Sequence, residues 1–258
     1  MTWTAAVLLC MGTTMSGQTS SYSTQSITKD LEHFKDWSAS ELADGFKMKH
    51  LKEFHSPLMQ QLAKQLKNGT YQSRYLLNSY KPIPSNEVLK KTLKLYNGYS
   101  QYENITGVYL EQGENVVLVG DLHGRKVKLL IADWMRQPTS GYKPTEDPEG
   151  WGLKRQAISL HEGVNVIYVE KAGNVYLDYF ADDPETAPEI TIHFVTGKAN
   201  GYFDAETQNN EDWKNLLAQA VSPVLDIKTQ YMQLAYPVEF LKEFRPEDGK
   251  ELAEAYDK

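Results

Sequence analysis

The segment EITIHFV at residues 189–195 alternates apolar and polar side chains with the two-residue period of a β-strand. This alternation places Ile190, Ile192 and Phe194 on one face of the strand and His193 on the other. We expect the apolar face to cover a hydrophobic core. We interpret His193 as a hydrogen-bonded residue of the sheet rather than a metal ligand.

Short runs of β-favouring residues recur at short intervals on both sides of this segment. Turn signals such as Gln112-Gly113, Glu162-Gly163 and Ala172-Gly173-Asn174 separate most of the runs. Long helical patterns do not intervene, which disfavours a parallel βαβ arrangement. The spacing predicts a mainly β protein, with a jelly-roll or β-sandwich domain at residues 70–203. The other extended runs lie at residues 71–80, 107–110, 116–119, 127–131, 157–160, 164–169 and 175–180.

A helical flank is predicted before this domain, at residues 35–69. Ser56-Pro57 is an N-cap followed by proline at the first helical position. Leucines then recur every four residues from Leu58, and Asn68-Gly69 provides the stop signal.

The C-terminal residues 204–258 are predicted to be an α-helical segment. A first helix carries Trp213 and Leu217 in its apolar stripe, and Pro223 begins a second helix that includes Tyr231. We expect these helices to fray and to expose apolar surface through Trp213, Leu217 and Tyr231.

Residues 1–17 are predicted to be a signal peptide, because small residues near Ser16 follow the apolar run around Cys10. The run is too short to span a bilayer, and residues 18–34, rich in Ser, Thr and Gln, are expected to form a disordered linker. Export would place the protein in the periplasm, at the surface or outside a bacterial cell. A lipoprotein acylated at Cys10 is the alternative, although the large Leu9 precedes this cysteine. With one cysteine in the chain, an intramolecular disulfide and a cysteine-based zinc site are both excluded.

The composition limits the partners. The 258 residues carry a net charge of −7, so the chain has no electrostatic reason to bind nucleic acid or an anionic membrane. Its 16 tyrosines and 5 tryptophans suit both β-sheets and sugar-binding surfaces, and therefore do not choose between them.

Two motifs look like catalytic sites but lack the residues that would complete them. Gly120-Asp121-Leu122-His123-Gly124 follows a strand, as in metallophosphoesterases, yet no later motif supplies the further metal ligands. His161-Glu162-Gly163-Val164-Asn165 has asparagine where a zinc-protease helix needs its second histidine. We interpret both as turns, and the sequence contains no H-E-x-x-H motif.

Two weaker candidates remain. Four acidic residues before Pro188 offer oxygens to a calcium ion, but their spacing matches no EF-hand loop and an ordinary turn is the alternative. The long irregular loop from Asp133 to Arg155 carries three aromatic residues that could stack on sugar rings or fold back over a sheet edge. The acidic residues are Asp178, Asp182, Asp183 and Glu185, and the candidate glycan contacts are Trp134, Tyr142 and Trp151.

The run TAPEITIHFVTGKANGYFD at residues 186–204 resembles the N-terminal accessory domain of the M-sixty peptidase family, the enhancin-like, mucin-degrading gluzincins. Further matching stretches occur in the same order and extend the resemblance over residues 35–258. They are NGTY at 68–71, ITGVY at 105–109, VVLVGDLHG at 116–124, LHEGVN at 160–165, GKEL at 249–252 and YD at 256–257.

The resemblance implies a non-catalytic jelly-roll accessory domain beside a gluzincin domain, in a secreted protein that acts on mucin-like glycoproteins. In the family, zinc is held by H-E-x-x-H and a downstream glutamate. Neither is present here, so no catalytic, cofactor-binding or metal-binding residue is carried over, and zinc is expected only in the missing catalytic domain. Residues 204–258 would be the truncated beginning of that domain, in a fragment or a truncated gene product.

The expected partners are the missing catalytic domain and a host glycoprotein or glycan. A stand-alone carbohydrate-binding β-sandwich is the alternative function, since a fold alone does not decide function. A free-standing hydrolase would need a complete catalytic constellation, which the sequence lacks.

Overall fold

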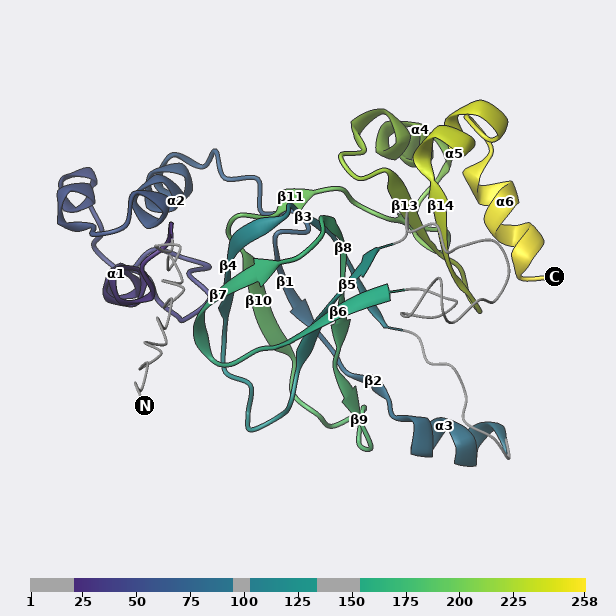
Figure 1. Cartoon of the computed structure of the whole chain (residues 1–258), viewed down its shortest axis with the longest axis horizontal. Helices are drawn as coiled ribbons and strands as arrows, with labels where there is room; N and C mark the ends of the chain where they lie inside the picture. The colour runs from purple at the N-terminus through teal and green to yellow at the C-terminus, as the bar shows by residue number, and fades with distance from the viewer. Residues whose placement is uncertain (1–20, 95–102, 134–153) are drawn as a thin grey trace, which may run out of the picture.

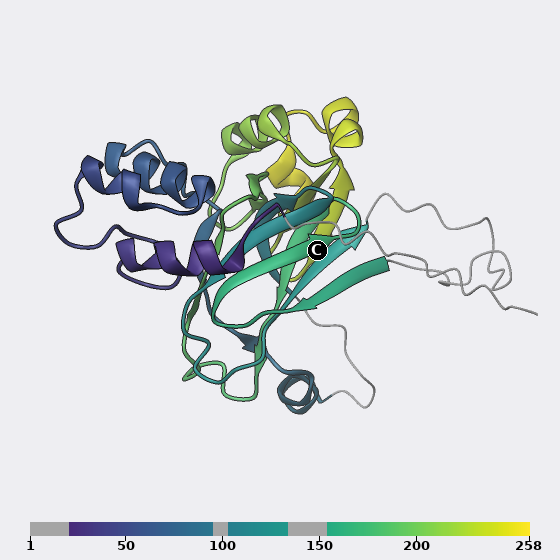
Figure 2. The same cartoon turned by 60° about the vertical axis from the view of Figure 1, so that its left-hand side comes forward.

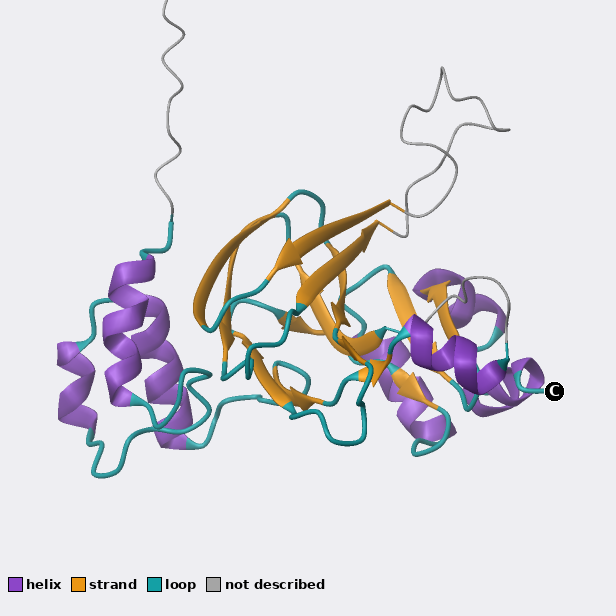
Figure 3. Cartoon of the chain, turned by 90° about the horizontal axis from the view of Figure 1, so that it is seen from below, coloured by secondary structure: helices purple, strands orange, loops and turns teal. Residues whose placement is uncertain are grey.

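The computed structural model describes residues 21–94, 103–133 and 154–258. Along the chain it forms a helical flank, a two-sheet sandwich and a C-terminal α/β unit (Figure 1). The sandwich lies between the other two parts (Figure 3). The protein is therefore mainly β with helices at both ends, as the sequence predicts.

The sandwich has the strand order of a jelly roll. One sheet has the order β1-β10-β4-β7, and the other has the order β11-β3-β8-β5-β6. Apart from the short β11, each sheet interleaves early and late strands, as two Greek keys folded together produce. All seven runs predicted between residues 107 and 195 form strands, and the run at residues 71–80 forms one from residue 77 onward. The bounds are β1 Leu77–Tyr80, β3 Asn104–Leu110, β4 Gly113–Val119, β5 Lys128–Asp133, β6 Lys154–Ser159, β7 Gly163–Val169, β8 Gly173–Asp178, β10 Ile190–Phe194 and β11 Lys198–Ala199.

The core between the two sheets contains the apolar face predicted for residues 189–195. Ile190, Ile192 and Phe194 are all buried there. In β4, Val117 and Val119 point into the same core, whereas the intervening residues pack under the helical flank. A strand buried on both faces reads as a continuous apolar run, which explains the sequence of β4.

The helical flank covers the outer face of the four-stranded sheet (Figure 2). Ile27, Met59 and Leu62 form a second core with Val116 and Leu118 of β4. The elements are α1 Thr24–Asp30, the 3₁₀ helices η1 Leu31–His33 and η2 Met48–Glu53, and α2 Pro57–Asn68.

The prediction of disorder for residues 18–34 is wrong for the described residues from Ser21 onward. Ser23 caps α1, and Ile27 and Leu31 lie one helical turn apart and are buried. The segment is rich in Ser, Thr and Gln, so its two buried apolar residues did not indicate a helix at the level of composition.

The caps predicted for the longer flank helix are confirmed. The hydroxyl of Ser56 accepts a hydrogen bond from the backbone of Met59, and Pro57 occupies the first turn. Gly69 ends α2 in the left-handed conformation, with a φ of 66°.

The C-terminal unit has its own sheet and its own core. The sheet has the order β12-β13-β14, and three helices pack on it. The bounds are β12 Phe203–Asp204, α4 Asn210–Gln219, β13 Val224–Lys228, β14 Gln233–Pro237, α5 Val238–Phe244 and α6 Gly249–Tyr256.

Two expectations for this unit are wrong. The helix predicted from Pro223 is the strand β13, because a short strand buried on both faces cannot be distinguished from a helix by periodicity. The predicted exposure fails for Trp213 and Leu217, which are 0% and 3% exposed in the core of the unit, and holds for Tyr231, which is 59% exposed.

Three small elements complete the described part of the chain. β2 (Ile83–Pro84) pairs in parallel with β9 (Phe180–Ala181), and α3 (Asn86–Leu93) follows β2. Within the described ranges, no helix is both long enough and apolar enough to cross a bilayer.

Candidate functional site

The three aromatic residues predicted to contact glycans, Trp134, Tyr142 and Trp151, lie outside the described residues. The two ends of their loop are described. β5 and β6 pair up to the register of Asp133 with Lys154, and β6 is the edge strand of its sheet. The residues between them therefore join the two strands of a hairpin at one edge of this sheet.

The motif at residues 120–124 is a tight turn, as predicted. The backbone N–H of His123 donates to the Asp121 carboxylate at 2.6 Å, and His123 and Gly124 have φ values of 52° and 72°. The imidazole of His123 lies 3.4 Å from the same carboxylate, and both side chains are largely exposed. One such pair does not make a dinuclear metal centre.

The motif at residues 161–165 is also a turn, as predicted. The Asn165 side chain closes it by accepting from the His161 N–H at 3.0 Å and donating to the His161 carbonyl at 2.7 Å. Asn115 closes a related turn by donating to the Glu111 carbonyl at 2.9 Å. Asn165, at the position where an H-E-x-x-H motif would have its second histidine, therefore has a structural role.

The acidic residues considered for calcium are used in separate contacts. Asp183 accepts two hydrogen bonds from the Arg125 guanidinium, at 3.0 and 2.9 Å, and this arginine holds the pKa of Asp183 below its ordinary value. Asp182 accepts from the hydroxyl of Ser85. Across the residues with described positions, no three His, Cys, Asp or Glu side chains gather as a metal site would require. The described residues therefore offer no ligand set for the zinc ion that the resemblance implies.

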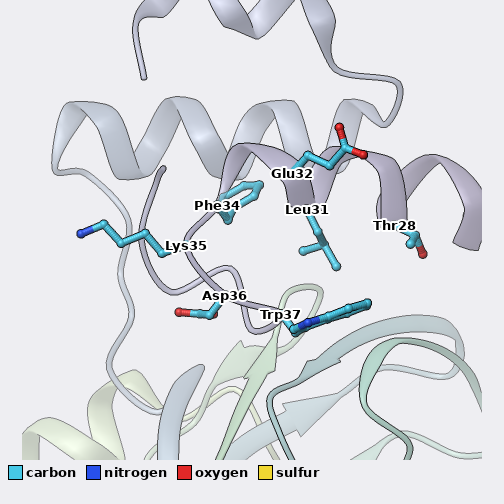
Figure 4. Close-up of a pocket in the computed structure, with 7 residues that line it drawn as sticks. All are labelled: Thr28, Leu31, Glu32, Phe34, Lys35, Asp36 and Trp37. Atoms are coloured by element: carbon cyan, nitrogen blue, oxygen red, sulfur yellow. The ribbon is translucent and has the colours of Figure 1, made fainter. Parts of the chain in front are cut away.

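A cleft of about 380 Å³ lies between α1, η1 and the segment that follows them (Figure 4). The indole of Trp37, in a residue that is 56% exposed, lies below Leu31 in this view. The indole packs against Gly163, where a Cβ atom would come within 2.7 Å of the ring. The absence of a side chain at Gly163 therefore allows the indole to rest on the sheet.

Two of the polar residues around this cleft, Asp36 and Lys35, are already engaged by their neighbours, whereas Thr28 and Glu32 also line it. The Asp36 carboxylate accepts from Ser38 and Ser40, and Lys35 pairs with Glu41 at 2.7 Å. The cleft thus offers an exposed aromatic surface with few free directional partners.

A second hollow, which we call the Tyr75 pocket, has a volume of about 310 Å³ and a more polar lining. It lies between the segment that enters β1 and the segment that joins β12 to α4. Its principal side chains are Arg74, Tyr75, Asn78, Tyr202, Asp204 and Gln208.

The backbone of Tyr75 is held in a strained conformation. Its φ of 67° is in the left-handed region, which is an outlier for a bulky residue. A Cβ atom at Gly107 or Gly201 would come within 2.6 or 3.3 Å of the Tyr75 ring. Two glycines from distant parts of the chain therefore form the floor on which this ring lies.

The remaining groups of the Tyr75 pocket are polar. The Tyr202 ring meets the Tyr75 ring edge-on at 5.8 Å, and the Arg74 guanidinium lies 4.9 Å from the Tyr75 centroid. Burial raises the pKa of the Tyr202 phenol, so its hydroxyl remains protonated. Asp204 pairs with Lys228 at 3.0 Å.

Sequence reasoning missed both hollows. Trp37 and Tyr75 stand in no motif, and their supports at Gly163, Gly107 and Gly201 are distant in the sequence. The one available signal was the glycine of Gly201-Tyr202, inside the run that carries the family resemblance.

No family model and no curated protein matches the chain. Solved structures do match it. A metallopeptidase from Bacteroides thetaiotaomicron has a TM-score of 0.75 at 20% identity, over 94% of this chain and 40% of that chain. A metallopeptidase in complex with Tn antigen has a TM-score of 0.59 at 21% identity, over 73% of this chain and 34% of that one. The catalytic module of the metalloprotease ZmpA from Clostridium perfringens has a TM-score of 0.53 at 18% identity, over 70% and 38%.

At these identities the comparisons show a shared fold. The resemblance to metallopeptidases of this kind is thereby confirmed at the level of the fold. The chain spans 40% or less of the length of these three structures.

Proposed function

We propose that this chain is the non-catalytic N-terminal accessory region of a secreted bacterial zinc metallopeptidase of the M-sixty type, which acts on mucin-like glycoproteins. The observation that carries the proposal is the fold shared with the Bacteroides metallopeptidase over 94% of this chain and 40% of that protein. In this proposal the zinc ligands belong to a separate catalytic domain. The accessory region supports that domain or directs it to its substrate.

An exposed aromatic surface supports the scaffolding role. On α5, Phe240 and Phe244 are 45% and 56% exposed, with their rings 4.8 Å apart, and Tyr236 stacks on Phe240. Exposed apolar groups gathered in this way are typical of a surface that another domain covers.

Two measurements test the proposal. The coding sequence of the full gene should contain an in-frame H-E-x-x-H motif outside the present chain. The purified chain, supplied with zinc, should leave an O-glycosylated mucin intact, whereas a protein that also contains the motif should cleave it. Zinc-dependent cleavage by the present chain alone would contradict the proposal.

The alternative is a stand-alone module that binds carbohydrate or glycoprotein. One of the matching metallopeptidases was solved in complex with Tn antigen, which supports testing glycans of this class. A glycan array with the wild-type chain and with Trp134→Ala and Trp151→Ala tests it. Loss of binding in these variants supports the targeting role, and an array without binding supports the scaffolding role.

Export and the state of Cys10 belong to the same proposal. Expression of the full chain in a bacterial host should give a mature protein in the periplasm or medium, shortened near residue 17. Mass spectrometry of the mature N-terminus separates signal cleavage from acylation of Cys10.

A further inference from the structure

We propose that the Tyr75 pocket binds a sugar residue that carries a negatively charged substituent, either a carboxylate or a sulfate. This assignment goes beyond the accessory role. The site could fail to bind sugar while the region still supported a catalytic domain.

The first step of the argument is the strained backbone of Tyr75. Left-handed backbone at a bulky residue is unfavourable and persists where the surrounding structure enforces it, often at ligand sites. Here Gly107 and Gly201 both leave space for the Tyr75 ring. The structure thus holds an aromatic ring in a fixed place at the wall of a hollow.

The second step is the chemistry of the lining. A sugar ring offers an apolar C–H face and a rim of hydroxyl groups, so its sites combine an aromatic face with planar polar side chains. The pocket provides the ring of Tyr202, which meets Tyr75 edge-on, together with the amides of Asn78 and Gln208, while the Tyr75 ring lies against the two glycines with the Arg74 guanidinium over it. The side-chain oxygen of Gln208 already accepts a hydrogen bond from the backbone N–H of Asp204 at 2.6 Å. This contact fixes the orientation of the Gln208 amide. A volume of about 310 Å³ is at the small end of pockets that hold small molecules.

The third step is the charge. Asp204 is neutralised by Lys228, which lies 3.0 Å away. Among the described residues Arg74 forms no ion pair, and its guanidinium lies over the Tyr75 ring. Glu206 lies 4.0 Å from Lys228, so the Arg74 guanidinium is the cation at this pocket that has no carboxylate within salt-bridge distance among the described residues. A guanidinium binds a carboxylate or sulfate through paired N–H groups, which selects an acidic sugar over a neutral one.

The test is titration calorimetry of the full chain with three probes: N-acetylneuraminic acid, a sulfated galactose, and unmodified galactose. We expect saturable binding of at least one acidic sugar, and binding of galactose at least about tenfold weaker. The acidic sugar that binds identifies the substituent. Perturbed amide signals of residues 73–78 and 202–208 in the NMR spectrum should place it in the pocket.

The decisive variant is Arg74→Ala, because this side chain is exposed and its removal leaves the core intact. Binding should weaken roughly ten- to a hundredfold, as expected for loss of hydrogen bonds to a charged group. Arg74→Lys keeps the positive charge but not the paired N–H groups of the guanidinium, so its affinity should lie between those of the wild type and Arg74→Ala. Lys126→Ala removes one exposed positive charge elsewhere on the sandwich and should bind as the wild type does. Absence of acidic-sugar binding, equal binding of galactose, or equal weakening by both alanine variants would each overturn the proposal.

Discussion

Tyr176 of β8 donates a buried hydrogen bond to the carboxylate of Asp226 in β13 and so joins the sandwich to the C-terminal unit. Asn174 donates a second hydrogen bond to the same carboxylate at 2.8 Å. Burial raises the pKa of Asp226 to about 6, although both hydrogen bonds act in the opposite direction. An ionisable group therefore lies in the contact between the two parts.

We predict that Asp226 makes the protein less stable as the pH rises through its titration range. The folded pKa of about 6 lies above the ordinary value of 3.8, so the folded chain holds the proton more tightly between these two values. Once the pH exceeds both values, ionisation of Asp226 has lowered the free energy of unfolding by on the order of 2–3 kcal/mol. Because His193 also titrates in this range, the contribution of Asp226 is the difference between the urea-unfolding slopes of the wild type and of Asp226→Asn between about pH 4 and pH 7.

Asp183→Asn is the matched control, because Asp183 is an exposed carboxylate whose pKa is lowered. It should leave the slope from Asp226 in place. Asp226→Ala should destabilise the chain at all of these pH values by about 1–3 kcal/mol, since the Tyr176 hydroxyl and the Asn174 amide would lose their acceptor. Equal slopes in the wild type and in Asp226→Asn would show that Asp226 does not contribute this pH dependence.

A second buried contact joins the helical flank to the sandwich. The Nδ1 of His193 lies 2.7 Å from the Ser38 carbonyl, which can only accept, so Nδ1 carries the proton. Nε2 then accepts from the hydroxyl of Tyr71. Burial lowers the pKa of His193 to about 4, so the imidazole is neutral at pH 7.

We predict that acid loosens the flank, which is the opposite sign to the effect of Asp226. The folded pKa of about 4 lies below the ordinary 6.5, so the unfolded chain binds the proton more readily between these values. Stability from this group is complete above about pH 6.5 and falls by on the order of 3 kcal/mol as the pH drops towards 4. Amide exchange, corrected for intrinsic rates, should show α2 losing protection before α4 does.

Tyr71→Phe isolates the histidine contact. It leaves Nε2 of His193 without a donor and should cost about 1–2 kcal/mol at neutral pH. Protection lost first in α4 on acidification would show that the flank is not the acid-sensitive part.

The strands were predictable because their signal is local. The alternation in residues 189–195 and the continuous apolar run of β4 each follow from which faces are buried. The caps of α2 at Ser56 and Gly69 were likewise predictable, because each depends only on residues next to it in the sequence. β13 was mistaken for a helix because it is buried on both faces, with Asp226 among its apolar neighbours.

The two hollows were not predictable for a different reason. The ring of Tyr75 depends on space left at Gly107 and Gly201, and the indole of Trp37 depends on Gly163. These pairs meet only after the sheets have formed. A glycine in a strand signals a close approach, but the sequence does not say which ring approaches it.

We predict that Gly163→Ala destabilises the chain more than Gly113→Ala does. Both glycines begin a strand with positive φ, 81° and 109°, and both precede the asparagine of a related turn by two residues. Either substitution costs about 1–2 kcal/mol of backbone strain. A Cβ at Gly163 also meets the Trp37 ring at 2.7 Å, whereas nothing lies within 4 Å of one at Gly113.

The additional loss for Gly163→Ala should be on the order of 1 kcal/mol, since the exposed indole can partly move aside. Thermal or urea unfolding measures the difference. In the Trp37→Ala background the two glycine variants should cost the same amount. An unchanged difference in that background would mean that the indole does not rest on Gly163.

The last prediction concerns Gly249, at the start of α6. A Cβ there would come within 2.1 Å of the Trp213 ring, and the indole N–H of Trp213 donates to the Arg245 carbonyl at 2.8 Å. By helix propensity alone, alanine at Gly249 would stabilise the chain by up to about 1 kcal/mol. We expect overpacking against the fixed indole to outweigh this gain, with a net loss of about 1–3 kcal/mol. Amide exchange should show the loss in α4 and α6 and leave β4 and β7 unchanged. Lys250→Ala, at the exposed neighbouring position, should be close to neutral. A more stable Gly249→Ala variant would mean that Trp213 is free to move, as it would be in a unit without a packed core.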